Sequence, residues 1–191
     1  MMEVVASTPT QVLLLPGWQN SLSGHWQTEW ELLHGDCRVL QHDWNRPRRG
    51  DWLAALQDHM LKQHDGVRFV FAAHSLGCHL VSAWSVFGAE QLVKRVRGAL
   101  LVAPPDLEQA NLPPELRGWL PGVYNPLPFE SRLVASDNDP FATPSASQQM
   151  AERWGSHLTW LHGAGHINAD SGLAAWPEGR AWLNEWIKEK R

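Results

Sequence analysis

The chain has 191 residues, a length that suits one domain, residues 1–191, with a substantial hydrophobic core. Hydrophobic residues make up 43% and charged residues 19%, which argues against an intrinsically disordered chain. A formal net charge of −4 argues against a nucleic-acid partner, and no stretch is apolar over the roughly 18 residues of a membrane span. The N-terminus lacks the basic and apolar regions of a secretion signal, so we expect a cytoplasmic protein without a membrane partner. Oligomeric state is not predicted.

Short apolar runs rich in β-branched residues alternate with amphipathic segments along the chain. This alternation is typical of buried strands and covering helices, and it predicts an α/β fold with a mainly parallel sheet of about six strands covered on both faces. In chain order, the expected strands span residues 11–16, 38–43, 67–73, 96–103, 132–135 and 158–161. The expected helices span residues 26–33, 51–62, 76–87, 146–154 and 176–188.

The third expected strand runs directly into a tight turn that has Ser75 at its apex. A serine between a strand and a helix is held in a strained conformation that lifts its hydroxyl above the sheet. The usual Gly-x-Ser-x-Gly pattern appears here with Ala73 at its first position and Gly77 at its last. Alanine fits if that position needs no positive φ. A polar turn after a strand is common in α/β proteins, so the pattern alone only suggests that Ser75 is a nucleophile.

Acids and a histidine follow later strands. The loops at the carboxyl ends of parallel strands share one edge of the sheet, where active sites form. Ser75, the acids within residues 136–139 and His166 follow strands in the order Ser, Asp, His, which is the order found in α/β-hydrolases. Acyl transfer needs a serine, a histidine that takes and returns its proton, and a carboxylate that fixes the imidazole tautomer. We therefore predict that Ser75 is the nucleophile and His166 the general base.

Two residues could supply the carboxylate. Asp139 precedes Pro140, which disfavours a helical conformation and holds Asp139 extended beyond the end of its strand. Asp137 is the alternative, although an aspartate in such a turn often bonds only to its own backbone. We favour Asp139.

The first expected strand ends at Pro16 and Gly17. Glycine allows the backbone to turn an amide toward the serine, so we expect an oxyanion hole formed by the backbone N–H groups of Trp18 and Leu76. On its own, a Pro-Gly pair would be read as the end of a strand. The predicted triad beside it favours the functional interpretation.

Metal and nucleotide chemistry are not expected. His162 and His166 are four residues apart, but a Gly-Ala-Gly turn separates them, so they cannot share a helical face as paired metal ligands would. No glycine-rich loop followed by Lys-Ser/Thr is present to bind phosphate. We predict no metal, no cofactor and a small-molecule substrate.

Several short motifs are spread over nearly the whole chain. They are Pro-Gly-Trp-Gln-Asn-Ser at 16–21, His-Trp-Gln at 25–27, Asp-Trp at 43–44, Ala-His-Ser-Leu-Gly at 73–77, Val-Ala-Pro at 102–104, Asp-Asn-Asp-Pro-Phe at 137–141 and Gly-Ala-Gly-His-Ile-Asn at 163–168. Together they resemble the small α/β-hydrolases of the YdeN type, a serine hydrolase family that includes a retinoblastoma-binding protein. The Leu-x-Cys-x-Glu motif that gave this relative its name is absent, so its partner is not expected here.

This resemblance implies a three-layer α/β-hydrolase fold with a short sheet and no large lid. It also implies that the triad is Ser75, Asp139 and His166. The implied activity is that of an esterase-like serine hydrolase that cleaves a small ester, thioester or amide through an acyl-enzyme. A binding protein that keeps the scaffold without turnover, or an acyltransferase that uses the same triad, are the alternatives.

The segment between the fourth and fifth strands, residues 104–130, is rich in proline. We expect it to wall the substrate pocket rather than to form a helical cap. The side chains expected in this wall are Trp119, Leu120, Tyr124 and Leu127. For residues 25–27 we favour a structural role in packing the first helix, although these residues could instead line the pocket.

Overall fold

A six-stranded parallel sheet forms the centre of the protein. The computed structural model describes residues 9–188. Its strands lie in the order β2-β1-β3-β4-β5-β6, and every neighbouring pair is parallel. Their bounds are β1 (Thr10–Leu15), β2 (Cys37–Arg38), β3 (Arg68–His74), β4 (Val96–Val102), β5 (Glu130–Ala135) and β6 (His157–Trp160).

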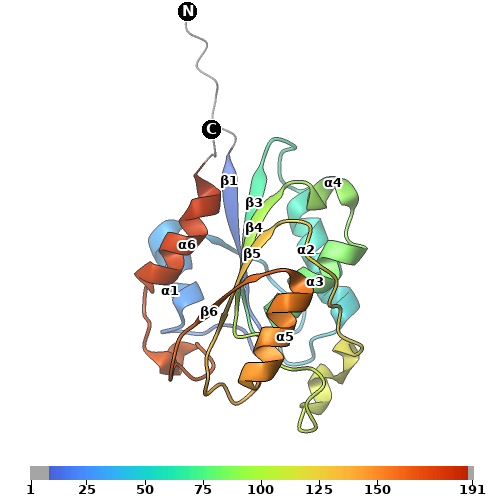
Figure 1. Ribbon diagram of the computed structural model, residues 1–191. Coiled ribbons are helices and arrows are strands. Elements are labelled where there is room, and N and C mark those ends of the chain that lie inside the picture. The colour runs from blue at the N-terminus through green and yellow to red at the C-terminus, as the bar shows by residue number, and fades with distance from the viewer. Residues whose placement is uncertain (1–8, 189–191) are drawn as a thin grey trace, which may run out of the picture.

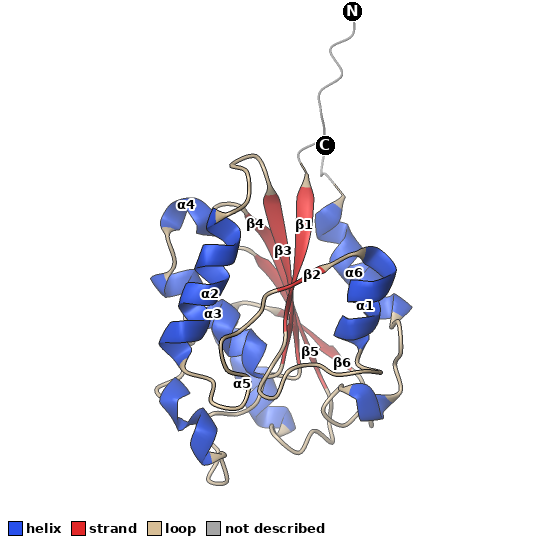
Figure 2. Cartoon of the chain, turned by 180° about the vertical axis from the view of Figure 1, so that it is seen from behind, coloured by secondary structure: helices blue, strands red, loops and turns tan. Residues whose placement is uncertain are grey.

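Helices cover both faces of the sheet and complete three layers. One face carries α1 (Trp26–His34) and α6 (Pro177–Ile187), and the other carries α2 (Arg49–Leu61), α3 (Leu76–Phe87), α4 (Glu90–Val93) and α5 (Pro144–Trp154) (Figures 1 and 2). Two short 3-10 helices, η1 (Pro114–Trp119) and η2 (Ala169–Ser171), lie in the connecting loops. None of the helices within residues 9–188 is both long and apolar enough to cross a membrane.

The core has two parts, one on each side of the sheet. Successive side chains of β1 point to opposite faces, so Leu13 and Leu15 pack beneath α2 and α3. Val12 and Leu14 pack instead against the tryptophans of α1 and α6. Because the central strands are buried on both faces, they read as continuous apolar runs rather than as alternating ones.

The order of the strands determines where a site can form. After β1 the chain moves outward to β2 at the edge of the sheet, and it then returns to β3 on the other side of β1. The loops that follow β1 and β3 therefore leave the sheet in opposite directions, and a crevice opens between them at the carboxyl ends of the strands. Leu15 pairs with Ala73 at this edge, two residues before Ser75.

The predicted sheet and its two helical layers are confirmed, but some elements differ from the expectation. The second strand was expected over residues 38–43, whereas β2 contains only Cys37 and Arg38. Leu40 is 73% exposed, and the Asp43 carboxylate accepts hydrogen bonds from the backbone of a following turn. The chain has therefore left the sheet by this point. Helix α4 and the 3-10 helices were not predicted, because they are too short to show a helical period.

Candidate active site

Ser75 lies at a strained turn between β3 and α3. Its backbone has φ 55° and ψ −125°, a conformation that residues other than glycine rarely adopt. Two neighbours allow the turn. A Cβ atom added to Gly77 would overlap the backbone carbonyl of Leu15, so α3 can begin this close to β1 only if residue 77 is glycine. Ala73 is not among the residues with positive φ, so alanine meets no conformational penalty there.

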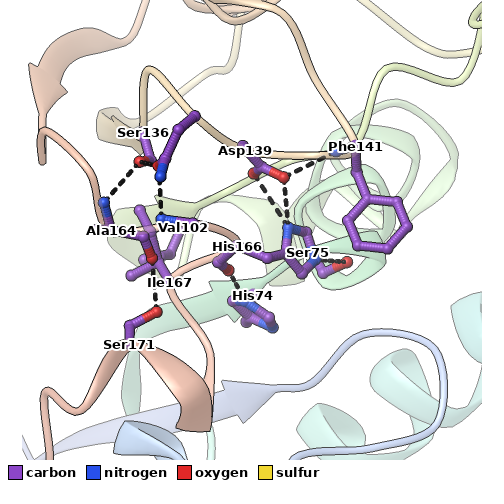
Figure 3. Close-up of polar contacts among 12 residues, drawn as sticks. His74, Ser75, Val102, Ser136, Asp139, Phe141, Ala164, His166, Ile167 and Ser171 are labelled. Atoms are coloured by element: carbon purple, nitrogen blue, oxygen red, sulfur yellow. Dashed lines mark hydrogen bonds and ion pairs between the residues drawn. The ribbon is translucent and has the colours of Figure 1, made fainter.

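His166 and Asp139 reach Ser75 from two later loops. The Nε2 atom of His166 lies 3.0 Å from the Ser75 Oγ, and its Nδ1 atom lies 3.0 Å from each carboxylate oxygen of Asp139 (Figure 3). The side chains of Asp139 and His166 are only 2% and 11% exposed. The backbone N–H of Phe141 donates a further hydrogen bond to the Asp139 Oδ1. The fold thus brings all three predicted residues into one continuous chain of contacts.

Asp137 lies apart from this chain. Its carboxylate accepts hydrogen bonds from the backbone N–H of Gly163 and from the Nδ1 of His162, each at 2.8 Å. The hydrogen bond from Gly163, with that from His162, lowers the pKa of Asp137 below its ordinary value. Asp137 therefore anchors the loop that carries His166 and does not contact His166 itself.

Sequence reasoning did not identify two further anchors of this loop. Ser136 is fully buried, and its Oγ accepts a hydrogen bond from the N–H of Ala164. Asn138 accepts one from the N–H of Gly165. The loop after β5 thus binds successive amides of the loop after β6, which fixes the position of His166 relative to Asp139. Both residues stand beside the predicted acids, but a lone serine or asparagine in a turn gives no separate sequence signal.

The predicted oxyanion residues also lie beside Ser75. A Cβ atom added to Gly17 would lie 2.7 Å from the Ser75 Cβ and 3.1 Å from the backbone nitrogen of Leu76, so the loop after β1 passes directly over the turn. Within residues 9–188, no acceptor takes a hydrogen bond from the amide of Trp18 or of Leu76. The indole N–H of Trp18 donates to the carbonyl of Asn45, which holds the Trp18 side chain in place.

A cavity of about 310 Å³ opens beside Ser75, a volume at the small end of the range for ligand pockets. Its walls are mainly apolar, and the polar residues that line it carry no fixed charge. The apolar lining residues are Trp18, Leu22, Pro105, Leu116, Phe141 and Ala169.

The prediction for the segment after β4 was only partly right. No α-helix forms between β4 and β5, so no helical cap covers the cavity from there. However, this segment contributes Pro105 and Leu116 to the lining, and not the four residues that were predicted. Trp119 is buried in the core, where its indole N–H donates to the carbonyl of Pro47, and Leu120 is 41% exposed. A large apolar side chain in a loop can fill either a core or a pocket, and sequence alone does not separate the two.

Residues 25–27 divide between structure and site. Trp26, the first residue of α1, is buried against the loop of His166, and its indole N–H donates to the carbonyl of Ile167. Gln27 is fully buried and donates to the carbonyl of Ala72 in β3. Both have the structural role that was favoured. His25, in contrast, lines the cavity beside Ser75.

A parallel α/β sheet with a serine at a strained turn after β3, and with an aspartate and a histidine on later loops, defines the class of α/β-hydrolases. Comparison with known proteins identifies the family. The model of the serine hydrolase family matches residues 12–185, and the chain belongs to this family. No curated protein matches the sequence.

Solved structures with this fold include two of the YdeN type. A YdeN-like hydrolase from Pectobacterium atrosepticum is 26% identical, with a TM-score of 0.80 over 95% of this chain and 92% of the other. The ydeN gene product of B. subtilis is 21% identical, with a TM-score of 0.70 over 94% and 100% of the two chains. Est1E from Butyrivibrio proteoclasticus, solved with ferulic acid bound, shares the fold at 14% identity, with a TM-score of 0.70 over 95% and 90%. The protein is therefore a serine hydrolase whose fold is similar to those of the YdeN-type hydrolases.

Proposed function

We propose that this hydrolase cleaves small esters, thioesters or amides through an acyl-enzyme formed on Ser75. One observation carries the proposal. The Ser75 Oγ, the His166 imidazole and the Asp139 carboxylate form an unbroken chain of contacts, each 3.0 Å long, and Ser75 and His166 line a small, mainly apolar cavity. This is the geometry that acyl transfer requires of a nucleophile, its base and the group that orients the base.

The chemistry follows from the position of each proton. Asp139 accepts the Nδ1–H of His166, which leaves Nε2 free to take the proton of the Ser75 hydroxyl. The Ser75 Oγ bonds to the substrate carbonyl carbon, and the carbonyl oxygen becomes an oxyanion that the amides of Trp18 and Leu76 stabilise. When the bond to the leaving group breaks, His166 returns the proton to that group. Water then attacks the acyl-enzyme with His166 again as base, the bond between the acyl carbon and the Ser75 Oγ breaks to release the acid, and His166 returns the proton to the Ser75 Oγ.

The cavity indicates the kind of substrate. Its small volume and mainly apolar walls suit an uncharged acyl group of few carbons, and no lysine or arginine among residues 9–188 lines it to bind an anion. We therefore propose a small, uncharged substrate.

A fluorophosphonate probe tests the nucleophile, because it bonds to an activated serine. We expect it to label the wild-type protein and not Ser75→Ala. Ser145→Ala removes an exposed hydroxyl at the start of α5 and serves as the matched control, with labelling as in the wild type. Labelling that survives Ser75→Ala would refute the assignment.

A further inference from the structure

His25 is a buried histidine in the wall of the cavity beside Ser75, and the proposed mechanism does not use it. The residue is 4% exposed and precedes the first turn of α1 as its N-cap. Its ring packs edge-on against the ring of His74 with centroids 4.6 Å apart, and the ring of His74 lies 4.9 Å from that of His166. His25 is thus within two ring contacts of the proposed general base.

The hydrogen bonds of His25 fix its tautomer. Its Nδ1 accepts a hydrogen bond from the backbone N–H of Gln27 at 3.1 Å, and this bond caps the helix. A neutral imidazole carries one proton, so with Nδ1 as acceptor the proton is on Nε2. Burial, together with the charges of Arg38 and His166, lowers the pKa of His25 to about 3. The ring therefore presents an Nε2–H donor at neutral pH.

This donor has no partner. The Nε2 atom is fully buried, and no acceptor in the described part of the chain contacts it. Within residues 9–188, five other buried side-chain atoms also lack partners. They belong to residues that do not line the cavity beside Ser75, namely Gln11, Gln41, His79, Trp84 and Trp176. An unpaired buried donor is costly, so a site that contains one favours a ligand that supplies the missing acceptor.

We propose that His25 is a substrate-specificity residue, whose Nε2–H donates a hydrogen bond to a second oxygen of the substrate, close to the scissile ester. The preferred substrates are then oxygenated esters rather than purely aliphatic ones. The rest of the wall is apolar over most of its area and also contains the amides of Gln19, Asn20 and Asn168. His25 differs from these in that its donor is buried and has no partner, so it distinguishes an oxygen from a methylene of similar size at its own position. This inference rests on the proposed function, because it names a substrate class for the same site.

Pairs of esters that differ only by oxygen in place of one methylene test the proposal. For the acyl side the pair is p-nitrophenyl methoxyacetate and p-nitrophenyl butyrate. For the alcohol side it is 2-methoxyethyl butyrate and n-butyl butyrate, with acid release as the readout. The two arms show which half of the substrate carries the oxygen.

Two variants separate the donor from the helix cap. His25→Asn keeps an acceptor close to the backbone for the Gln27 N–H but loses the distant donor. His25→Gln places an amide N–H near the position of the Nε2–H but weakens the cap. In at least one arm, we expect His25→Asn to lower kcat/KM for the oxygenated ester about three- to tenfold more than for its carbon analogue, which is the value of one neutral hydrogen bond. His25→Gln should largely restore the preference and should lower the melting temperature more than His25→Asn does.

Equal losses on both members of each pair in His25→Asn would overturn the proposal, because a structural role or a bridging water affects all substrates alike. Failure of His25→Gln to restore the preference would also count against it. A wild-type protein that hydrolyses the aliphatic esters and loses this activity in Ser75→Ala keeps the proposed function even if the His25 result is negative. If the wild type cleaves none of the four esters and the fluorophosphonate does not label Ser75, the proposed function and this inference fail together.

Discussion

The Nε2–H of His74 donates a 2.9 Å hydrogen bond to the backbone carbonyl of His166, so the residue before the proposed nucleophile holds the loop of the proposed general base (Figure 3). His74 is 5% exposed, and burial, followed by the charges of His25 and His166, lowers its pKa well below the ordinary value. It therefore remains neutral and adds no positive charge beside His166. The bond ties the turn after β3 to the loop after β6, although these segments are 92 residues apart.

Removing this bond should impair catalysis more than substrate binding. In His74→Ala the His166 ring loses one of its positional supports, and we expect kcat for an ester such as p-nitrophenyl butyrate to fall by up to about a hundredfold, with little change in KM. His74→Gln retains an amide donor that can reach the His166 carbonyl and should recover much of the lost kcat. A positioning role would be contradicted if His74→Ala and His74→Gln changed KM and the melting temperature to the same extent.

Substitution of the two acids should separate their roles. Asp139→Asn can no longer hold the His166 imidazole in its useful tautomer, so we expect kcat to fall on the order of a thousandfold or more. Asp137→Asn still offers an oxygen to the Gly163 N–H and loses only an exposed interaction with His162, so kcat should change little. Steady-state kinetics on the two variants decides the matter, and a larger loss in Asp137→Asn would show that the assignment is wrong.

Gly77 should tolerate no side chain. A methyl group there overlaps the carbonyl of Leu15 in β1, where the backbone cannot move without disturbing the central sheet. We expect Gly77→Ala to lower the free energy of unfolding by about 3 kcal/mol or more, up to failure to fold. Gly50 is the control, because it lies in α2 at an exposed position where an added methyl group would meet no neighbouring atom. Gly50→Ala should be neutral or stabilising by up to about 1 kcal/mol in urea unfolding, and equal losses in both variants would contradict the steric explanation.

Stability should fall as the pH drops below 6.5. Burial lowers the pKa of His25 to about 3 and that of His79 to about 4, while the unfolded chain keeps values near 6.5. Above pH 6.5 these histidines are neutral in both states. Between pH 6.5 and about 4 only the unfolded chain gains the protons, so each histidine should lower the free energy of unfolding by roughly 1 kcal/mol per pH unit.

Urea unfolding at pH 7.5, 6.0 and 5.0 measures this slope. His79→Gln isolates one contribution, because glutamine retains a donor for the carbonyl of Pro105 but does not titrate. The variant should lose less stability than the wild type between pH 6.5 and 5. Parallel curves for the two proteins would show that His79 does not stay neutral in the folded state.

The long elements of the fold were predictable from sequence, but the short ones were not. β3 and β4 are continuous apolar runs and α3 follows the serine turn, so the observed bounds of these three elements lie close to the predicted ones. The edge strand β2 was overestimated, because the two apolar residues that suggested its continuation, Val39 and Leu40, belong to a loop in which Val39 is buried and Leu40 is exposed. Pairing with a single neighbour through two residues leaves no periodic signal.

The candidate site was predictable where chemistry restricts the choice of residue. Ser75, Asp139 and His166 stand at strand ends in the order that the fold requires, and glycines lie in the turns of Ser75 and His166. The anchoring of the His166 loop by Ser136 and Asn138 was not predictable, because serine and asparagine occur in many turns. The same limit explains why Trp119 was expected in the pocket wall and lies in the core.

The sequence by itself determined the parallel α/β architecture and the choice of candidate reacting groups, because hydrophobic periodicity and side-chain chemistry are local properties of the chain. Only the tertiary structure decided which acid meets His166 and that Leu116 rather than Trp119 faces the cavity. It alone revealed that the Nε2–H of His25 has no partner. These relations depend on distances between segments far apart in sequence, and loop packing sets those distances.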